Sequence, residues 1–200
     1  MPPGRPGSGV FAFGGIESDG EGGRGMNVRT TTLFALLIAL TTVATMVVQI
    51  PTPPTQGYIN VGDSMIYVSA LLFGPLAGLL AGGIGSALAD WLTGYGQFAP
   101  YTLVIKGLEG LVVGLIAWAL LKGRPTPTLA GILSAIVAML VGGAIMVSGY
   151  YVVEQFIMGK AAAAEVPGNI FQAVGGLVIA IPVTLLLRNL APSMRSPMVR

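Results

Sequence analysis

The stretch that decides the fold is residues 63–92, DSMIYVSALLFGPLAGLLAGGIGSALADWL, a nearly uncharged run that Gly74-Pro75 breaks near its middle. As one helix it would be roughly 45 Å long, because an α-helix rises about 1.5 Å per residue. That is too long for one membrane span, which needs roughly 20 residues, and short for two. Proline lacks an amide hydrogen and its ring clashes with the preceding turn, so we expect Pro75 to interrupt the helix.

The composition places the chain in a membrane. Of its 200 residues, 54% are hydrophobic and only 9% are charged, and the mean hydropathy is +0.81, whereas a soluble domain carries about 25% charged residues. The sequence has no cysteine and no histidine, which excludes disulfides, zinc sites and catalysis by those side chains. We therefore expect an integral membrane protein without a cofactor or a metal ion. The net charge of +2 is spread along the chain, so we expect no nucleic-acid partner.

Four further apolar runs are each long enough to span a membrane. They lie at about 30–50, 101–122, 128–152 and 168–190. If residues 63–92 hold two short helices, the chain has six membrane-spanning helices, and the second of them (63–73) is unusually short. We expect loops at 51–62, which is polar and rich in proline, and at 94–100.

The positive charges favour six spans over five, because cytoplasmic loops collect Lys and Arg. With six spans and a cytoplasmic N-terminus, one side of the membrane holds Arg24, Arg29, Lys122, Arg124, Arg188, Arg195 and Arg200. Only Lys160 then lies in an outer loop, whereas a five-span chain would place the last five of those residues outside. We therefore predict an all-α, six-transmembrane-helix bundle in the cell membrane, with both termini cytoplasmic.

The predicted bundle domain covers residues 26–192. Residues 1–25 are rich in Gly and Pro and contain no long apolar run, so we expect a disordered tail. Residues 193–200 are expected to form a short cytoplasmic tail. Met26 precedes Asn-Val-Arg and the first apolar run, which suggests the hypothesis that translation starts there.

Few polar residues interrupt the helices, and those that do gather at one end. A charged side chain in a membrane helix costs about 2.5–3.5 kcal/mol on insertion scales and therefore marks function by default. In the six-helix topology all of these residues lie toward the outer face: Asp63, Asp90, Lys106, Glu109, Glu154, Asn169 and Gln172. Aromatic loop residues are expected to rim the same region: Tyr58, Trp91, Tyr95, Phe98 and Tyr101. The pattern predicts a binding cup that opens outward.

Several of these residues also have a structural interpretation. Lys106 and Glu109 share a helix face, so they form an internal ion pair, a pair that binds a ligand, or both, because such a pair can exchange one partner for a ligand group. Asp63 could instead cap the N-terminus of a helix, and the aromatic residues could form an interfacial belt. Asp90 gains nothing from the dipole at a helix C-terminus, which favours a specific partner there. Glu154 and Glu165 either line the rim or face water.

Small residues recur at helical spacing in three of the expected helices. The first helix has Ala35 and Ala39, the third has glycines from Gly78 to Gly85, and the fourth has Gly107, Gly110 and Gly114. Such faces let helices approach closely, and packing within the bundle is their ordinary explanation. Gly82-Gly83-Ile84-Gly85-Ser86 has no following Lys and lies in an apolar run, so it is not a phosphate-binding loop.

Several short motifs resemble those of one membrane-protein family. They are Asn60 with Gly62-Asp63, Phe73-Gly74-Pro75, Gly85-Ser86-Ala87-Leu88-Ala89-Asp90 and Lys106-Gly107-Leu108-Glu109-Gly110. Together they make residues 57–120 similar to the substrate-binding S component of energy-coupling factor (ECF) vitamin transporters, and most of all to the riboflavin-type group. The first, fifth and sixth helices match only in number and character.

The resemblance implies a subunit that captures a vitamin, while a transmembrane T subunit and two ATPase subunits on other chains supply the energy. It also implies that Ala35 and Ala39 dock on the T subunit, and that a loop at about 51–62 closes over the vitamin. The residues expected to bind the substrate are Asn60, Asp63, Asp90, Tyr95, Lys106, Glu109, Asn169 and Gln172. Riboflavin is the leading candidate ligand, with thiamine, a pyrimidine precursor and pyridoxine as alternatives.

Two other functions remain as alternatives. An intramembrane enzyme would have only an Asp63–Asp90 pair or a Ser86–Lys106 dyad, and neither lies in a known catalytic motif, so we expect no enzyme. A stand-alone secondary carrier usually has ionisable groups at the membrane midplane with access from both sides. Here the polar residues lie on one side and no inverted repeat is visible, which favours a binding subunit.

Overall fold

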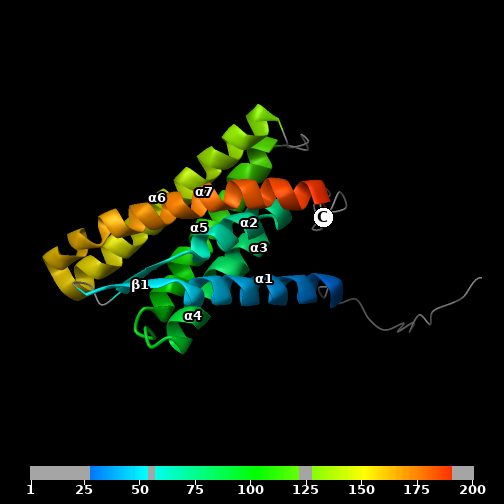
Figure 1. The fold of residues 1–200 in the computed structure, drawn as a ribbon. Helices are drawn as coiled ribbons and strands as arrows, with labels where there is room; N and C mark the ends of the chain where they lie inside the picture. Colours follow the sequence, from blue (N-terminus) through cyan, green and yellow to red (C-terminus); the bar gives the residue numbers. More distant parts are fainter. Residues whose placement is uncertain (1–27, 54–56, 122–127, 191–200) are drawn as a thin grey trace, which may run out of the picture.

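The chain folds into a bundle of helices with one small β-hairpin (Figure 1). The computed structural model describes residues 28–53, 57–121 and 128–190. In chain order its elements are α1 (Val28–Val47), β1 (Gln49–Thr52), β2 (Gly57–Asn60), α2 (Gly62–Phe73), α3 (Pro75–Leu80), the π-helical turn η1 (Ala81–Gly85), α4 (Ser86–Leu92), α5 (Ala99–Leu121), α6 (Leu129–Met158), the short 3-10 helix η2 (Gly159–Ala164) and α7 (Val166–Leu190).

The long run 63–92 holds two helices, as its length and its proline predict. Gly74 follows α2 with a φ of +90°, a conformation that glycine adopts without a Cβ clash. Pro75 then opens α3, where its missing amide hydrogen costs little because first-turn amides have no partner within the helix. From Pro75 to Leu92, α3, η1 and α4 follow one another without a break and form a single span.

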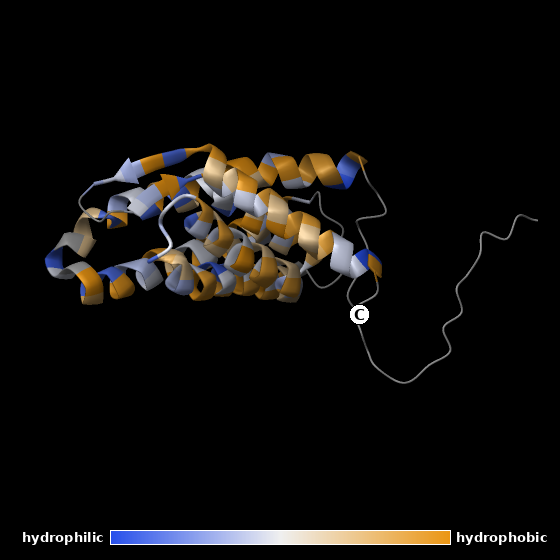
Figure 2. Cartoon of the chain, turned by 90° about the horizontal axis from the view of Figure 1, so that it is seen from below, coloured by the Kyte–Doolittle hydropathy of each residue, from blue (hydrophilic) through white to orange (hydrophobic). Residues whose placement is uncertain are grey.

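Six helical segments of the described chain match the six predicted spans. Five are long and apolar enough to cross a membrane: Val28–Val47, Pro75–Leu92, Ala99–Leu120, Leu129–Ile157 and Ala162–Leu190. The sixth is α2. Figure 2 shows helices that are hydrophobic over most of their length, which fits contact with lipid.

The start of the first helix and the end of the last helix lie at the same end of the bundle. α1 begins and α7 ends at the same end of the bundle (Figure 1), as an even number of crossings requires. The cytoplasmic location of that end stays a prediction. The expected tails at 1–25 and 193–200 lie outside the described residues, as does Met26.

The short helix α2 forms the centre of the bundle. It has 12 residues, about 18 Å at the α-helical rise, against a hydrocarbon core about 30 Å thick. It is packed by α1, α5 and α7, and nearly every residue from Gly62 to Leu72 is buried. Protein rather than lipid surrounds α2, so its ends do not have to reach the two membrane surfaces. A helix shorter than the hydrocarbon core is therefore tolerated at this position.

The stretch expected to be a loop at 51–62 contributes to an antiparallel hairpin, so that expectation is wrong. β1 pairs with β2 in the register Gln49↔Asn60, Ile50↔Ile59, Pro51↔Tyr58 and Thr52↔Gly57. Pro51 cannot donate a ladder hydrogen bond, but a two-stranded hairpin leaves each strand a free edge where proline is tolerated. The hairpin lies at the end of the bundle where α7 begins (Figure 1), and β2 contacts α7.

Glycines bring α3 and η1 into backbone contact with α5. A Cβ on Gly110 would overlap the carbonyl of Gly78, and a Cβ on Gly82 would overlap the carbonyl of Lys106. Helices that approach this closely leave almost no room for a side chain at the contact. The packing interpretation of these glycines is confirmed, and the contact at Gly82 fixes the backbone that carries Lys106.

We predict that Gly110→Ala lowers the unfolding temperature of the purified chain in detergent, because its methyl group would force two helices apart. Overpacking of this kind costs about 1–3 kcal/mol. The matched control is Gly175→Ala on α7, where an added Cβ would meet nothing within 4 Å. Alanine there should leave the unfolding temperature unchanged or raise it. Equal unfolding temperatures for the two variants would contradict the close helix contact.

Candidate functional site

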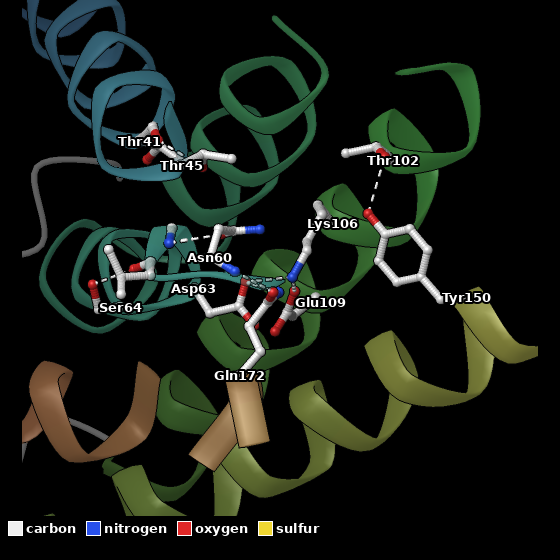
Figure 3. A network of polar contacts seen from close by, with 12 residues as sticks. Thr41, Thr45, Asn60, Asp63, Ser64, Thr102, Lys106, Glu109, Tyr150 and Gln172 are labelled. Carbon is white, nitrogen blue, oxygen red and sulfur yellow. Dashed lines mark hydrogen bonds and ion pairs between the residues drawn. The ribbon is translucent and has the colours of Figure 1, made fainter. Parts of the chain in front are cut away.

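Lys106 lies in a buried charge cluster that joins α2 and α5, and Figure 3 shows Asp63, Glu109 and Gln172 gathered at the end of its side chain. Its ammonium forms one ion pair with Asp63 of α2 and a second with Glu109 of α5, at 3.1 Å. All three side chains are almost completely buried. The internal Lys106–Glu109 pair predicted from their spacing is therefore present. Asp63 is not the N-cap residue of α2, which is Val61, and its carboxylate binds Lys106; it does lie in the first turn of α2, where the helix dipole favours a carboxylate.

The cluster carries two carboxylates and one ammonium, so it is net negative when all three are charged. Buried charges are tolerated only when they are paired and hydrogen-bonded, because water no longer solvates them. Gln172 of α7 adds to the pairing by donating from Nε2 to both Asp63 oxygens, at 3.2 and 3.3 Å. The helices α2, α5 and α7 therefore meet at one set of polar contacts.

Gln172 also connects the cluster to the hairpin. Its Oε1 accepts a hydrogen bond from the backbone N–H of Asn60 on β2, at 2.8 Å. The Asn60 side chain turns back, and its Oδ1 accepts from the N–H of Gly62 at 2.8 Å, which satisfies an amide at the start of α2. Polar contacts thus run without interruption from Lys106 to the hairpin.

A cavity of about 450 Å³, partly open to solvent, lies between Lys106 and the hairpin. Its wall consists of Thr45, Gly57, Tyr58, Asn60, Ser86, Asp90, Phe98, Thr102, Lys106, Tyr150, Glu154, Glu165, Asn169 and Gln172. This volume includes the solvent-filled space at the open mouth of the cavity. Glu154 and Glu165, which the sequence places either at the rim or in water, both belong to this wall. Most of the residues that line the cavity have polar side chains, although the chain is 54% hydrophobic.

Tyr58 of β2 lies in the cavity wall and binds Asp90 of α4. Its hydroxyl donates to Asp90 Oδ1 at 2.6 Å. Burial, together with the Asp90 carboxylate, raises the pKa of the Tyr58 hydroxyl well above its usual value, so the group stays a donor. The ring of Tyr95 packs on that of Tyr58, with centroids 4.5 Å apart and planes tilted by 46°. The specific partner expected for Asp90 is therefore Tyr58.

Two more side-chain hydrogen bonds fasten strand β1. Thr52 donates to Oε1 of Glu165 at 2.8 Å, and Gln49 donates from Nε2 to the Thr93 hydroxyl at 3.2 Å. Glu165 immediately precedes α7, whereas Thr93 follows α4. The hairpin is thus tied to two separate helices, and it covers the cavity between them.

Four polar atoms of the cavity wall have no hydrogen-bond partner among the described residues. They are Ser86 Oγ, Asp90 Oδ2, Glu154 Oε2 and Asn169 Nδ2. The four residues are at most 5% exposed. Buried polar groups are nearly always hydrogen-bonded, because an unmet donor or acceptor costs about 1–3 kcal/mol. Four of them around one cavity indicate a site for a molecule with several polar groups.

The cavity collects most of the residues predicted to bind a substrate. Those in its wall are Asn60, Asp90, Lys106, Asn169 and Gln172. The other three, Asp63, Glu109 and Tyr95, lie behind the wall and pack against residues that form it. Which of these residues contact a substrate stays a prediction.

The expected aromatic rim is seen only in part. Tyr58 and Phe98 line the cavity. Trp91 is 73% exposed and Tyr101 is 41% exposed, and neither is part of the wall. The rim assignment of these two residues stays a prediction, and their exposure also fits the interfacial belt.

Several wall residues escape sequence reasoning, notably Thr45, Thr102 and Tyr150. The hydroxyls of Thr102 and Tyr150 hydrogen-bond each other at 2.9 Å, and the Tyr150 ring centroid lies 5.9 Å from the Lys106 ammonium. Threonine is ordinary in a membrane helix and Tyr150 stands in a long apolar run, so neither residue type marks a site. The one available signal is spacing, because Tyr150 lies one turn before Glu154 on the same face of α6.

The chain matches the protein family described as ECF-type riboflavin transporter, S component, over residues 25–189. Its fold is similar to the solved structure of the S component of a bacterial ECF transporter, with a TM-score of 0.59. The two chains are 24% identical, and the match covers 84% of this chain and 98% of the other. This likeness supports the six-helix fold.

Curated relatives cover most of the chain. An uncharacterized protein of Pyrococcus woesei is 49% identical over 139 residues, which are 69% of this chain and 87% of the relative. The thiamine precursor transporter HmpT of Lactococcus lactis subsp. cremoris is 29% identical over 156 residues, which are 77% of this chain and 84% of the relative.

We predict that Lys106→Met destabilises the chain, because it leaves the Asp63 and Glu109 carboxylates buried without their cation. Removing one partner of a buried ion pair costs about 3–5 kcal/mol. The measurement is unfolding of the purified variant in detergent. The triple variant Lys106→Met/Asp63→Asn/Glu109→Gln should recover most of the lost stability, because it buries no charge in the cluster. If Lys106→Met alone were as stable as the wild-type chain, the cluster would not be a buried ion pair.

Proposed function

Because the chain belongs to the family of ECF-type riboflavin transporter S components, we propose that it captures its vitamin in the cavity between Lys106 and the hairpin. It is a multi-pass membrane protein and the substrate-binding subunit of a vitamin uptake transporter. The observation that carries the assignment of the site is the group of four unpartnered polar atoms in the cavity wall. A bound vitamin would supply their missing partners.

The hairpin would control entry to the cavity. Side-chain hydrogen bonds of Gln49, Thr52 and Tyr58 hold it closed. Such bonds contribute about 0.5–1.5 kcal/mol each, or about 1.5–3 kcal/mol where one partner is charged. A few of them can therefore open without disturbing the helices. The vitamin would enter from the outer face, and the re-formed bonds would close the hairpin over it.

Polar groups from three helices would hold the vitamin. The Lys106 ammonium has three N–H donors; it hydrogen-bonds Asp63 and forms an ion pair with Glu109, and a remaining N–H would serve a ligand. Asn169 would donate from its unpartnered Nδ2, and Asp90 would accept at its free Oδ2. Asn60 and Gln172 would keep the hairpin in register with the cluster.

Riboflavin is the first candidate ligand, because the description of the family names it. The relative from Lactococcus lactis is named for a thiamine precursor. A pyrimidine precursor, thiamine and pyridoxine are therefore the alternatives. All of these are small heterocycles with several polar groups, as the cavity wall requires.

The α1 surface is the part of the molecule that would dock on a T subunit. Ala35 and Ala39 are both exposed and lie one turn apart. Exposed apolar side chains flank them: Leu36, Leu40 and Val43. A stripe of small residues between larger apolar ones lets a second helix approach closely. Two ATPase subunits on other chains would then supply the energy, so this chain would perform no catalytic step.

We predict that the chain, purified alone in mild detergent, binds one vitamin per molecule. Riboflavin is titrated first by the quenching of its fluorescence, and thiamine, its pyrimidine precursor and pyridoxine follow by calorimetry. Asn169→Ala should weaken binding about tenfold, because it removes one hydrogen bond to the ligand. The matched control is Asn189→Ala, at an exposed position of the same helix.

Failure of the chain to bind any of these vitamins would overturn the assignment of the cavity. Uptake by the chain alone in liposomes, without partner subunits, would instead favour the stand-alone carrier.

We predict that the double variant Ala35→Leu/Ala39→Leu keeps its affinity for the vitamin but no longer assembles with the T subunit, because two larger side chains fill the docking stripe. The measurements are ligand titration of the isolated chain and co-purification of the coexpressed subunits. Ala130→Leu, at an exposed position of α6, is the control and should assemble normally. Normal assembly of the double variant would exclude this face of α1 as the docking surface.

A further inference from the structure

Carboxyl groups outnumber basic side chains in the described wall of the cavity. Three carboxyl groups line it, those of Asp90, Glu154 and Glu165, whereas Lys106 is the one basic side chain among the described residues of the wall. Lys106 is already shared by the two carboxylates behind it. The cavity therefore has no spare cation of its own with which to neutralise a bound anion.

Two of these carboxyl groups have an oxygen that can accept a further hydrogen bond. Asp90 Oδ2 and Glu154 Oε2 have no hydrogen-bond partner in the described part of the chain, although the two residues are only 4% and 3% exposed. A carboxylate oxygen removed from water without a donor is costly. A ligand that brings N–H groups to both oxygens removes that cost. The nearby Asn169 Nδ2 is the opposite case, because it is a donor that lacks an acceptor.

A metal ion is a poor candidate for the missing positive charge. Within the described residues, no three Asp, Glu, His or Cys side chains come close enough together to hold one. An organic ligand can span the distance between separate carboxyl groups, and it can offer a donor at one edge and an acceptor at another.

Aromatic rings complete the wall. Tyr58, Phe98 and Tyr150 all line the cavity. The face of an aromatic ring attracts a positive charge, so protein sites for organic cations commonly combine such rings with carboxylates. The same rings provide flat apolar surface for a planar ligand.

We propose that the cavity selects a flat nitrogen heterocycle that bears an amino group, with its N–H donors directed at Asp90 and Glu154 and an acceptor directed at Asn169. This selectivity rests on the proposed function and narrows its ligand. The flavin ring of riboflavin presents two carbonyl oxygens and a single N–H, so it would meet at most one of the two carboxylate oxygens and would bring acceptors toward the other. The wall thus favours the aminopyrimidine-like vitamins over a neutral flavin.

The test compares three probes on the purified wild-type chain. Thiamine carries both a positive charge and an amino group, oxythiamine has a carbonyl in place of that amino group, and riboflavin is neutral. We expect thiamine to bind at least tenfold more tightly than oxythiamine and riboflavin, because a hydrogen bond to a charged group is worth about a factor of ten or more. Riboflavin binding as tightly as thiamine, or oxythiamine as tightly as thiamine, would overturn the selectivity.

Substitutions test the carboxylates directly. Asp90→Asn and Glu154→Gln keep the size of each side chain and remove its charge, and each should weaken thiamine binding at least tenfold. Lys160→Gln is the control, because it changes the charge at an exposed position of η2. If either variant unfolds, the other variant and the wild-type probe ranking still decide the question. Unchanged or tighter thiamine binding by a folded carboxylate variant contradicts the proposed contacts.

The proposed vitamin site and its proposed selectivity are contradicted by different results. If riboflavin binds tightly and the carboxylate variants keep that affinity, the vitamin site stands and the selectivity is wrong. If the chain binds none of the probes and no other vitamin, the site itself is wrong and the selectivity falls with it.

Discussion

An ammonium group buried in a membrane protein needs carboxylate partners, because neither lipid nor apolar side chains solvate it. Lys106 has two such partners, Asp63 from the central helix α2 and Glu109 from its own helix. Asp63 reaches Lys106 because α2 packs on α5, and Gly78 and Gly82 bring α3 and η1 into backbone contact with the same helix. The charge cluster and the packing of the helices are therefore a single constraint. It also explains why a helix of 12 residues can stand at the centre of the bundle.

The same constraint extends to the hairpin. Gln172 donates to Asp63 on one side and accepts from the Asn60 backbone on the other, so the hairpin is held in register with the buried cluster. The cavity lies between these two parts, with Lys106 in its wall and the hairpin as its cover. A ligand that contacts both binds the closed form better than the open form and thereby favours closure. The contacts that bind the ligand are then also the contacts that close the hairpin over it.

The sequence predicts the helices well, because apolar length, the Gly74-Pro75 break and the distribution of positive charge are local properties. It also identifies many of the residues that line the cavity, since polar residues are rare in this chain. It cannot predict the pairing of Lys106 with Asp63, because 43 positions separate them and only the packed helices bring them together. For the same reason it cannot tell which polar side chains line the cavity and which lie behind its wall. The hairpin escapes prediction because its strands have four residues each and one contains a proline.

Hydrogen–deuterium exchange of the hairpin tests most directly whether the buried cluster holds the cover of the cavity in place. The comparison is between the wild-type chain and Gln172→Met, which keeps the length of the side chain and removes both of its polar contacts. The account predicts faster exchange at residues 57–60 in the variant, with unchanged exchange in the middle of α5. Equal exchange of the hairpin in both proteins would contradict the link between the cluster and the hairpin.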